Sequence, residues 1–303
     1  MPAGEFAEVG VEDEAGPVTL PPGLPGRDDE DAHLPDARPP VAVVLATRDR
    51  PELLAGALGA LRAALRSQDE LLVVDSASTG PGTGALCRRL GVQVLRLDAP
   101  GTSAARNAGL VATTAPLVAF TDDDCLPQPG WAAALAGAFG DPAVGVVTGR
   151  VLADRVVPAP VSLEESTVAR PFTTPVGHGA NCCFRREALL AVGGFDDRLG
   201  PGAPGRASED VDAFRRVLAA GWTGFYEPAA VVVHRQWRGR TASVRRSFAY
   251  GVGQAAAGGS WRTAVWRDAL APAVRDARAG YATGVAVGLA RAAGAVRGLV
   301  GRR

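Results

Sequence analysis

The sequence predicts an α/β fold in which helices flank a mostly parallel, Rossmann-like sheet. Two observations support this prediction. From Pro40 onward, short apolar runs alternate with segments whose leucines recur at helical spacing, which is typical of right-handed strand–helix–strand units. One apolar run, beginning at Leu117, ends in three consecutive carboxylates. Open α/β sheets bind their ligands at the carboxyl ends of their strands, so this edge is the expected site.

The predicted elements follow one another from residue 40. The expected strands are Val41–Ala46, Leu71–Val74, Val92–Leu97, the run from Leu117, and Gly145–Val151. The expected helices begin at Pro51, lie around Leu86–Leu90, and span Ser103–Val111 and Ser208–Ala220. Thr102 or Ser103 is expected to cap the third helix, and Ser208 the last, since hydroxyl side chains accept hydrogen bonds from free backbone N–H groups.

Charge divides the chain into three parts. Residues 1–39 are acidic, rich in Pro and Gly and without periodicity, which predicts a disordered tail. Residues 40–259 form the predicted folded domain, and residues 260–303 a basic helical tail. One face of that tail is expected to be apolar, with members Tyr281, Val285, Leu289, Val296 and Leu299. Such a helix either lies on a membrane surface or packs on the body of the protein.

Several classes of protein are excluded or disfavoured by composition. All 32 basic residues are Arg, and without Lys there is no Schiff-base lysine and no phosphate-binding GxxxxGK loop. No GxGxxG follows the first strand, which disfavours a dinucleotide-dependent dehydrogenase. HExxH, GxSxG and nucleic-acid-binding motifs are missing, so no nucleic-acid partner is expected. The four cysteines lack zinc or disulfide spacing, and no signal peptide or membrane-spanning run is present. These features predict a cytoplasmic protein.

Asp122, Asp123 and Asp124 form the acidic end of the Leu117 run. Adjacent carboxylates repel one another unless a cation lies among them, so the triplet indicates a metal or metal–phosphate site. The alternative is a solvated acidic turn or a helix cap, where Asp is also common.

Other polar residues follow strands or begin helices near the same edge. Asp75 ends the second strand, where a carboxylate can bind a ribose or a base, or merely form a turn. Thr47, Arg48 and Arg50 follow the first strand, where they either reach a diphosphate or pair with one of the aspartates. Arg106 can reach a diphosphate with its planar guanidinium or pair with one of the aspartates.

Glu209 and Asp210 lie in the first turn of a predicted helix, as an acid–base pair or as a helix cap. His234 ends the VVVH strand, either as a metal ligand through its neutral imidazole or as a structural residue.

The order of these segments resembles the family 2 glycosyltransferases of GT-A fold. The resemblance covers Val41 to Gly253 and is carried by VVLATRDRP, LLVVDSAS, GTSAARNAGL, FTDDDCLPQPGW and GANCCF…SEDVDAF. It implies a nucleotide-diphosphate sugar donor, Mn²⁺ or Mg²⁺ as cofactor, and a direct displacement that inverts the anomeric carbon.

The resemblance also implies roles for individual residues. The donor-binding residues would be Ala46, Thr47, Arg48, Asp75, Arg106, Asp122 and Asp123. The metal ligands would be Asp124, Asp122 and His234. Asp210 would be the general base, with Glu209 beside it.

One departure from the family pattern indicates which kind of transferase to expect, and two rival functions stay open. Gln236–Trp237–Arg238 has the wrong order for the QxxRW motif of processive synthases, which favours transfer of one sugar. The acceptor is a glycan, a lipid or a small molecule, and the basic tail allows peripheral contact with the inner face of a membrane. The rivals are a nucleotidyltransferase, which needs an early Gly- and Lys-containing loop, and a non-catalytic nucleotide-sugar or glycan-binding module.

Overall fold

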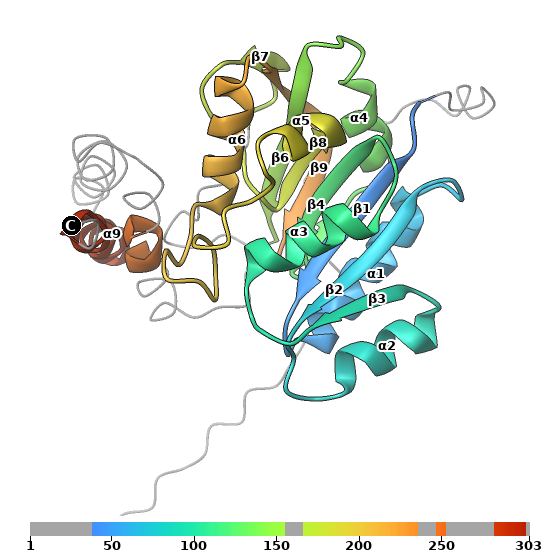
Figure 1. Ribbon diagram of the computed structural model, residues 1–303, viewed down its shortest axis with the longest axis horizontal. Helices are drawn as coiled ribbons and strands as arrows, with labels where there is room; N and C mark the ends of the chain where they lie inside the picture. The colour runs from blue at the N-terminus through green and yellow to red at the C-terminus, as the bar shows by residue number, and fades with distance from the viewer. Residues whose placement is uncertain (1–37, 155–165, 236–246, 253–281, 301–303) are drawn as a thin grey trace, which may run out of the picture. The chain divides into compact units, whose positions relative to one another are not determined.

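The computed structural model describes residues 38–154, 166–235, 247–252 and 282–300 (Figure 1). Within these ranges, helices flank one mixed nine-stranded sheet, with strand order β3-β2-β1-β4-β8-β6-β9-β5 and β7 paired with β9. The predicted α/β class is confirmed. Residues 1–37, nearly all of the predicted acidic tail, lie outside the described residues, as do Gln236–Trp237–Arg238 and residues 260–281 of the predicted basic tail.

The first half of the domain alternates strands and helices as the sequence predicts. Its elements are β1 (Val41–Thr47), α1 (Pro51–Ala64), β2 (Glu70–Ser76), α2 (Gly82–Leu90), β3 (Gln93–Leu97), α3 (Thr102–Ala112) and β4 (Leu117–Asp122). All pairings among these four strands are parallel, and the register sets Thr47 beside Asp75 and Ala46 beside Asp122. The polar residues after these strands therefore share one edge of the sheet.

The predicted cap of α3 is wrong. The N-cap residue is Gly101, with no side-chain cap hydrogen bond, and Thr102 is already the first helical residue. The Ser103 hydroxyl donates instead to the carbonyl of Leu199, at 2.8 Å. This hydroxyl therefore ties α3 to a distant loop, which the local sequence does not reveal.

The second half of the sheet is mixed. Its elements are β5 (Cys125–Pro127), α4 (Trp131–Gly137), β6 (Val144–Ala153), β7 (Arg170–Phe172), β8 (Asn181–Arg185), α5 (Arg186–Ala191), α6 (Glu209–Ala219) and β9 (Thr223–His234). Strand β8 is antiparallel to both β4 and β6, β6 and β9 are parallel, and β5 and β7 are antiparallel to β9. The expectation of a parallel sheet thus holds for β1 to β4. Beyond β4 the sheet is mixed: β6 and β9 are still parallel, whereas the antiparallel neighbours need no crossover helix and so leave no strand–helix alternation in the sequence.

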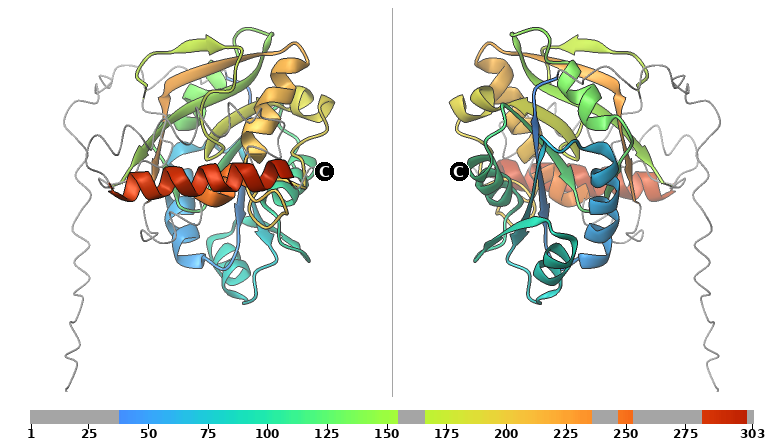
Figure 2. Two further views of the ribbon diagram at one scale, coloured as in Figure 1. Left: turned by 90° about the vertical axis from the view of Figure 1, so that its left-hand side faces the viewer. Right: turned by 90° about the vertical axis from the view of Figure 1, so that its right-hand side faces the viewer.

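Two hydrophobic layers enclose the sheet, and Figure 2 shows α1 and α3 on its opposite faces. Because side chains alternate along a strand, Val43 of β1 packs in the layer that contains α1, and Val44 in the layer that contains α3. Gly109 of α3 lies so close to Val44 that a Cβ atom there would overlap it. This close approach fixes α3 beside β1 and brings Arg106 to the sheet edge.

The described C-terminal residues are a short helical segment at 247–252 and α9 (Ala282–Val300). A Cβ atom on Gly251 would overlap the Arg291 carbonyl, so this segment packs on α9 backbone to backbone. The packed face of α9 carries small buried residues such as Ala295, whereas Leu289 and Val296 are 55% and 52% exposed. The predicted apolar face is therefore not the one that packs, as far as its side chains are described.

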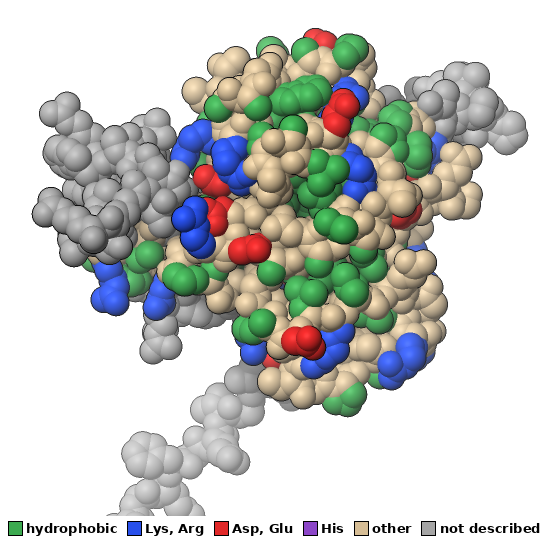
Figure 3. Space-filling model, in the orientation of Figure 1, with side chains coloured by type: hydrophobic (Ala, Val, Ile, Leu, Met, Phe, Trp, Pro, Cys, Tyr) green, Lys and Arg blue, Asp and Glu red, His purple; other side chains and the backbone are tan. Residues whose placement is uncertain are grey.

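No helix in the described ranges combines the length and the apolar character needed to cross a bilayer. On the face drawn in Figure 3, basic and acidic side chains lie close to one another. Local ion pairs such as Arg216–Asp212 on α6, at 2.7 Å, fit this arrangement.

Candidate active site

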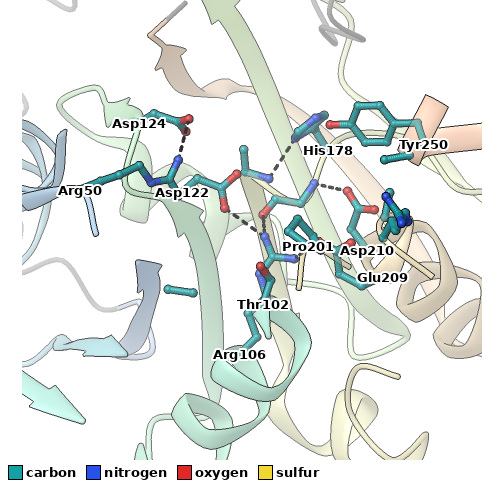
Figure 4. Close-up of a pocket in the computed structure, with 16 residues that line it drawn as sticks. Arg50, Thr102, Arg106, Asp122, Asp124, His178, Pro201, Glu209, Asp210 and Tyr250 are labelled. Carbon is teal, nitrogen blue, oxygen red and sulfur yellow. Dashed lines mark hydrogen bonds and ion pairs between the residues drawn. The ribbon is translucent and has the colours of Figure 1, made fainter. Parts of the chain in front are cut away.

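A cavity of about 620 Å³ opens at the carboxyl edge of β1 and β4 (Figure 4). It is lined by residues from both halves of the domain, among them Ala46, Arg106, Asp122, Asp124, Glu209 and Asp210. A second cavity of about 160 Å³ is lined by Thr47, Arg48, Ser76 and Thr102. Ala46, Arg50, Thr102 and Pro201 line both cavities. The structure thus gathers most of the predicted site residues at one edge of the sheet.

The acidic triplet is not a solvated turn. Asp123 and Asp124 are 0% and 2% exposed, whereas a solvated turn would leave them in water. The Thr47 hydroxyl donates to Asp123 Oδ2 at 2.6 Å. The guanidinium of Arg50 lies 3.0 Å from Asp123 and 3.7 Å from Asp124. Burial raises the pKa of Asp123 to about 7, although Arg50 and Thr47 act against that shift. A further cation beside these carboxylates would therefore stabilise their ionised form.

Asp124, Cys125 and His234 bring potential metal-ligand atoms within 4.8 Å of one another. The pairing of β5 with β9 sets Cys125 opposite His234, and Asp124 Oδ1 lies 3.6 Å from His234 Nε2. Burial raises the pKa of the Cys125 thiol well above its usual value, so it stays protonated. A carboxylate and an imidazole remain as the donor set; the carboxylate suits Mn²⁺ or Mg²⁺, and the imidazole nitrogen is a poorer ligand for the harder Mg²⁺ than for Mn²⁺. Sequence spacing gave no signal for Cys125, because its position depends on strand register.

Asp122 lies apart from that group, and its carboxylate faces Arg106. Arg106 is only 3% exposed; its guanidinium lies 3.1 Å from Asp122 Oδ1 and 2.9 Å from Glu209 Oε1. It also donates to the carbonyl of Gly179 at 3.4 Å. Of the two interpretations of Arg106, pairing with an aspartate is the one seen in this structure. One buried guanidinium thus joins α3, the end of β4 and the start of α6.

Glu209 and Asp210 begin α6 as predicted, but Ser208 does not cap it with its side chain. Ser208 has a left-handed backbone with φ of 70°, and its carbonyl, not its hydroxyl, is the group that bonds into the helix, accepting from the N–H of Asp212. This turn buries Glu209 against Arg106. Burial and the neighbouring Asp210 raise the pKa of Glu209, while the ion pair with Arg106 opposes the shift.

Asp210 lines the larger cavity, held by backbone donors. Its Oδ2 accepts from the N–H of Gly179 at 2.7 Å, and its Oδ1 from the N–H of Val211 at 2.8 Å. A Cβ atom on Gly179 would lie 2.8 Å from Asp210 Oδ2, so only glycine allows this approach. The position of this carboxylate therefore explains why a glycine, Gly179, begins the GANCCF segment, which His178 precedes in the run GHGAN (Gly177–Asn181).

Asp75 adopts the geometry of the turn alternative. It is 2% exposed, and its Oδ1 accepts from the N–H of Ser78 at 2.9 Å. Its Oδ2 accepts from Arg96 at 2.7 Å. Asp75 lines neither cavity; it lies next to Thr47 in the sheet, and Thr47 and Ser76 line the smaller one.

Sequence reasoning singled out neither Arg206 nor Tyr250, which line the larger cavity, and placed His178 only as part of the segment Gly177–Asn181, which the resemblance puts on the sugar and acceptor side. His178 and Tyr250 lie near Asp210, with the Tyr250 ring beside the His178 imidazole in Figure 4. Arg291 of α9 lies over the Tyr250 ring, 5.3 Å from its centroid. The GHGAN motif was a signal for His178, but nothing local marks Tyr250, which reaches the cavity only through tertiary packing.

The comparison with protein families decides the family. The model described as Glycosyl transferase family 2 matches residues 42–193, half of the chain. The chain belongs to this family. This family 2 chain is 34% identical over 243 residues to a pre-mycofactocin glycosyltransferase of Mycobacterium tuberculosis, an alignment that covers 70% of the chain and 49% of that relative. It therefore spans about half the length of that relative. It is also 31% identical over 189 residues to an uncharacterized glycosyltransferase of Mycobacterium bovis, covering 60% of the chain and 80% of that protein.

Solved structures confirm the GT-A fold of this family 2 chain. A mannosyltransferase, PcManGT from Pyrobaculum calidifontis in complex with GDP-Man and Mn²⁺, aligns with a TM-score of 0.62, 21% identity and 88% coverage of both chains. GalNAc-T7 with UDP, GalNAc and Mn²⁺ aligns with a TM-score of 0.55 and 15% identity, over 74% of this chain and 51% of the other.

Proposed function

We propose that this chain transfers one sugar from a nucleotide-diphosphate sugar to an acceptor hydroxyl, with a divalent metal ion and with inversion at the anomeric carbon. One observation carries the proposal: Asp124, beside His234, and Asp210 line the same cavity from opposite sides (Figure 4). A single displacement requires a residue that holds a cation beside the leaving diphosphate, and a base that accepts the proton of the acceptor hydroxyl.

The donor is proposed to lie across the two cavities. The smaller cavity, lined by Thr47, Arg48 and Thr102, suits the nucleoside, and the larger one suits the diphosphate and the sugar. The two solved structures of similar fold are complexes with GDP-Man and with UDP, which supports a nucleotide diphosphate here. Arg106 and Asp122 would contact the donor in the larger cavity, and the buried Asp123 would support the site behind its lining.

Asp124 and His234 would hold Mn²⁺ or Mg²⁺. When bound, the ion supplies positive charge to the departing diphosphate. Asp122, predicted as a further ligand, would first have to leave its ion pair with Arg106.

Asp210 is proposed as the general base. As the acceptor oxygen forms its bond to the anomeric carbon, the bond from that carbon to the diphosphate breaks, and the hydroxyl proton passes to the Asp210 carboxylate. The N–H groups of Gly179 and Val211 orient that carboxylate. Glu209, held by Arg106, fixes the start of α6 and so places Asp210. One displacement from the opposite face inverts the anomeric carbon, as in single-displacement glycosidases.

The experiment is a thermal-shift panel of GDP, UDP and their sugars, with and without Mn²⁺. A ligand that binds only the native state raises the melting temperature by mass action. We expect a Mn²⁺-dependent rise with one nucleotide, absent in Asp124→Asn and retained in Asp98→Asn, an exposed acid outside both cavities. No rise with any nucleotide would overturn the proposal.

The rival functions make different predictions. A binding module would show the same nucleotide-dependent rise, but would release no nucleotide diphosphate in the presence of donor and acceptor. A nucleotidyltransferase would release pyrophosphate from a nucleoside triphosphate, and family 2 membership disfavours it. In Asp210→Asn, a binding module would keep its nucleotide binding and a nucleotidyltransferase would keep its pyrophosphate release. The proposed glycosyltransferase would lose its turnover.

Peripheral contact of this proposed cytoplasmic enzyme with a membrane remains a prediction, supported by α9. Leu289 and Val296 are exposed there, with the exposed Arg297 beside Val296. In a flotation assay with anionic phospholipid vesicles, the paired change Leu289→Ser and Val296→Ser should reduce binding. Val111→Ser on α3, where the side chain is 79% exposed, is the matched control. Equal flotation of all three proteins would contradict the prediction.

A further inference from the structure

Arg50 is the residue that precedes α1, and its guanidinium lies between two buried carboxylates. It is 3.0 Å from Asp123 Oδ1 and 3.7 Å from Asp124 Oδ2. The side chain of Arg50 is 28% exposed, whereas those of the two aspartates are 0% and 2% exposed. A partly solvated cation thus faces the carboxylates that the proposed metal ion would face.

The contact between Arg50 and Asp123 is an ion pair without hydrogen-bond geometry. Asp123 Oδ1 is buried and has no hydrogen-bond donor among the described residues, although Arg50 is within ion-pair distance. Another arginine–carboxylate pair in this chain, Arg38–Asp69, does have hydrogen-bond geometry. Arg38 makes two parallel hydrogen bonds to Asp69, of 3.0 and 2.7 Å. The fit of Arg50 to its carboxylates is loose by that standard.

Arg50 also lines both cavities. The larger one contains Asp124 and Asp210, and the smaller one contains Thr47 and Thr102. A diphosphate that joins a nucleoside in one cavity to a sugar in the other must pass this border. The planar guanidinium binds phosphate oxygens through two parallel N–H groups, so Arg50 has a second anionic partner within its reach.

We propose that Arg50 exchanges partners when the donor binds. In the ligand-free protein it neutralises Asp123 and Asp124. When a divalent ion binds at Asp124 and His234, repulsion between the two cations moves the guanidinium to the diphosphate. This inference rests on the proposed function. Its consequence is that Arg50 opposes binding of the metal ion alone and favours binding of the metal ion together with a nucleotide diphosphate.

The test has a metal arm and a nucleotide arm. In the first, Mn²⁺ alone is titrated into the full chain, and free Mn²⁺ is measured from its electron paramagnetic resonance signal. In the second, GDP and UDP are titrated separately at saturating Mn²⁺ by calorimetry. The variants are Arg50→Gln, which removes the charge, and Arg50→Lys, which keeps the charge but loses the planar fork. Melting temperatures verify that each variant is folded.

Arg62→Gln is the matched control for the metal arm. It removes the same charge from α1, but Arg62 lines neither cavity and donates to the carbonyl of Leu90. Arg50→Gln should bind Mn²⁺ alone about three- to tenfold more tightly than the wild type. Arg50→Lys and Arg62→Gln should bind Mn²⁺ alone like the wild type.

In the nucleotide arm, both Arg50→Gln and Arg50→Lys should weaken binding of the preferred nucleotide by about tenfold, because both lose the phosphate fork. If Arg50→Gln binds Mn²⁺ alone no more tightly than the wild type, the exchange is overturned while the proposed metal site stands. If neither protein binds Mn²⁺, both the exchange and the metal-assisted function are overturned. Tighter Mn²⁺ binding with unchanged nucleotide affinity would also contradict the exchange, since the guanidinium would then have no second partner.

Discussion

Buried carboxylates lie at both edges of the sheet, and they differ in how many hydrogen-bond donors surround them. At the amino edge, the side chain of Asp69 is 0% exposed, and it accepts hydrogen bonds from the backbone N–H groups of Val41 and Arg66 as well as from Arg38. At the carboxyl edge, Asp123 is equally buried, but one of its oxygens lacks a hydrogen bond.

The pKa values follow the donors. Burial alone would raise the pKa of Asp69, yet hydrogen bonds from Arg38 and the backbone lower it overall. Burial raises the pKa of Asp123 to about 7, because Arg50 and Thr47 compensate less completely. An acid that serves the fold is supplied with donors by the fold itself. An acid that is left short of donors is a candidate for binding a ligand cation.

The largest expected effect concerns the carboxyl edge. Asp210→Asn should reduce sugar transfer about 10²- to 10⁴-fold, because a general base of this kind contributes roughly that factor. Nucleotide binding with Mn²⁺ should persist, which separates loss of chemistry from loss of the site. Release of nucleotide diphosphate in the presence of acceptor measures the first, and calorimetry the second. Asp212→Asn, on the same helix, should retain transfer, since Asp212 pairs with Arg216 outside the cavity.

The next largest effect is on stability, where the amino edge should be the more sensitive of the two. Asp69→Asn should lower the free energy of unfolding by about 3 kcal/mol, because it breaks a buried ion pair and leaves Arg38 without its carboxylate. Asp123→Asn should change it by less than about 1 kcal/mol, because the lost carboxylate was poorly satisfied. Urea denaturation at neutral pH measures both. Equal losses in the two variants would remove the distinction between the two edges.

The pH dependence of stability sharpens the same contrast. The pKa of Asp69 is lower in the folded chain than in the unfolded one, where it is about 3.9. Asp69 therefore contributes stability that is fully present above that value and is lost as the pH falls through the folded-state pKa. The difference in unfolding free energy between wild type and Asp69→Asn should shrink below about pH 4. A difference that stays constant down to pH 2 would contradict this assignment of Asp69.

The smallest effect tests the two arginines. Arg38→Lys should cost about 1 kcal/mol of unfolding free energy, because lysine cannot form the paired hydrogen bonds to Asp69. Arg50→Lys should cost less than about 0.5 kcal/mol, because that contact lacks hydrogen-bond geometry. Thermal unfolding of the two variants side by side measures the difference. A larger cost at Arg50 would show that its ion pair is structural.

The first half of the fold was predictable because its physical signals are local. Each signal is contained in a short stretch of sequence. The run from Leu117 to Asp124 joins an apolar strand to carboxylates, and the helix that begins at Pro51 shows leucines at helical spacing. The second half lacked such signals. Strand β8 enters antiparallel without a crossover helix, and Cys125 reaches His234 only through strand pairing.

The site was predictable by residue type but not by partner. Arg106 was expected near the aspartates, yet its pairing with Glu209 joins residues 103 positions apart, which no local pattern encodes. Tyr250 escaped notice because its position depends on α9, through Arg291 and Gly251. Asp75 was expected at the end of the second strand, as a ribose- or base-binding carboxylate or as a turn residue. Only the structure shows that it is buried and paired with Arg96.

Anomalous X-ray scattering from crystals grown with Mn²⁺ and a nucleotide diphosphate tests the central claim most directly. The amino edge, where Asp69 is saturated by donors, serves as the internal control. We predict an anomalous peak between Asp124 and His234, and none near Asp69. Bound nucleotide with no peak at Asp124, or a peak at Asp69 instead, would contradict the assignment of the carboxyl edge as the cation site.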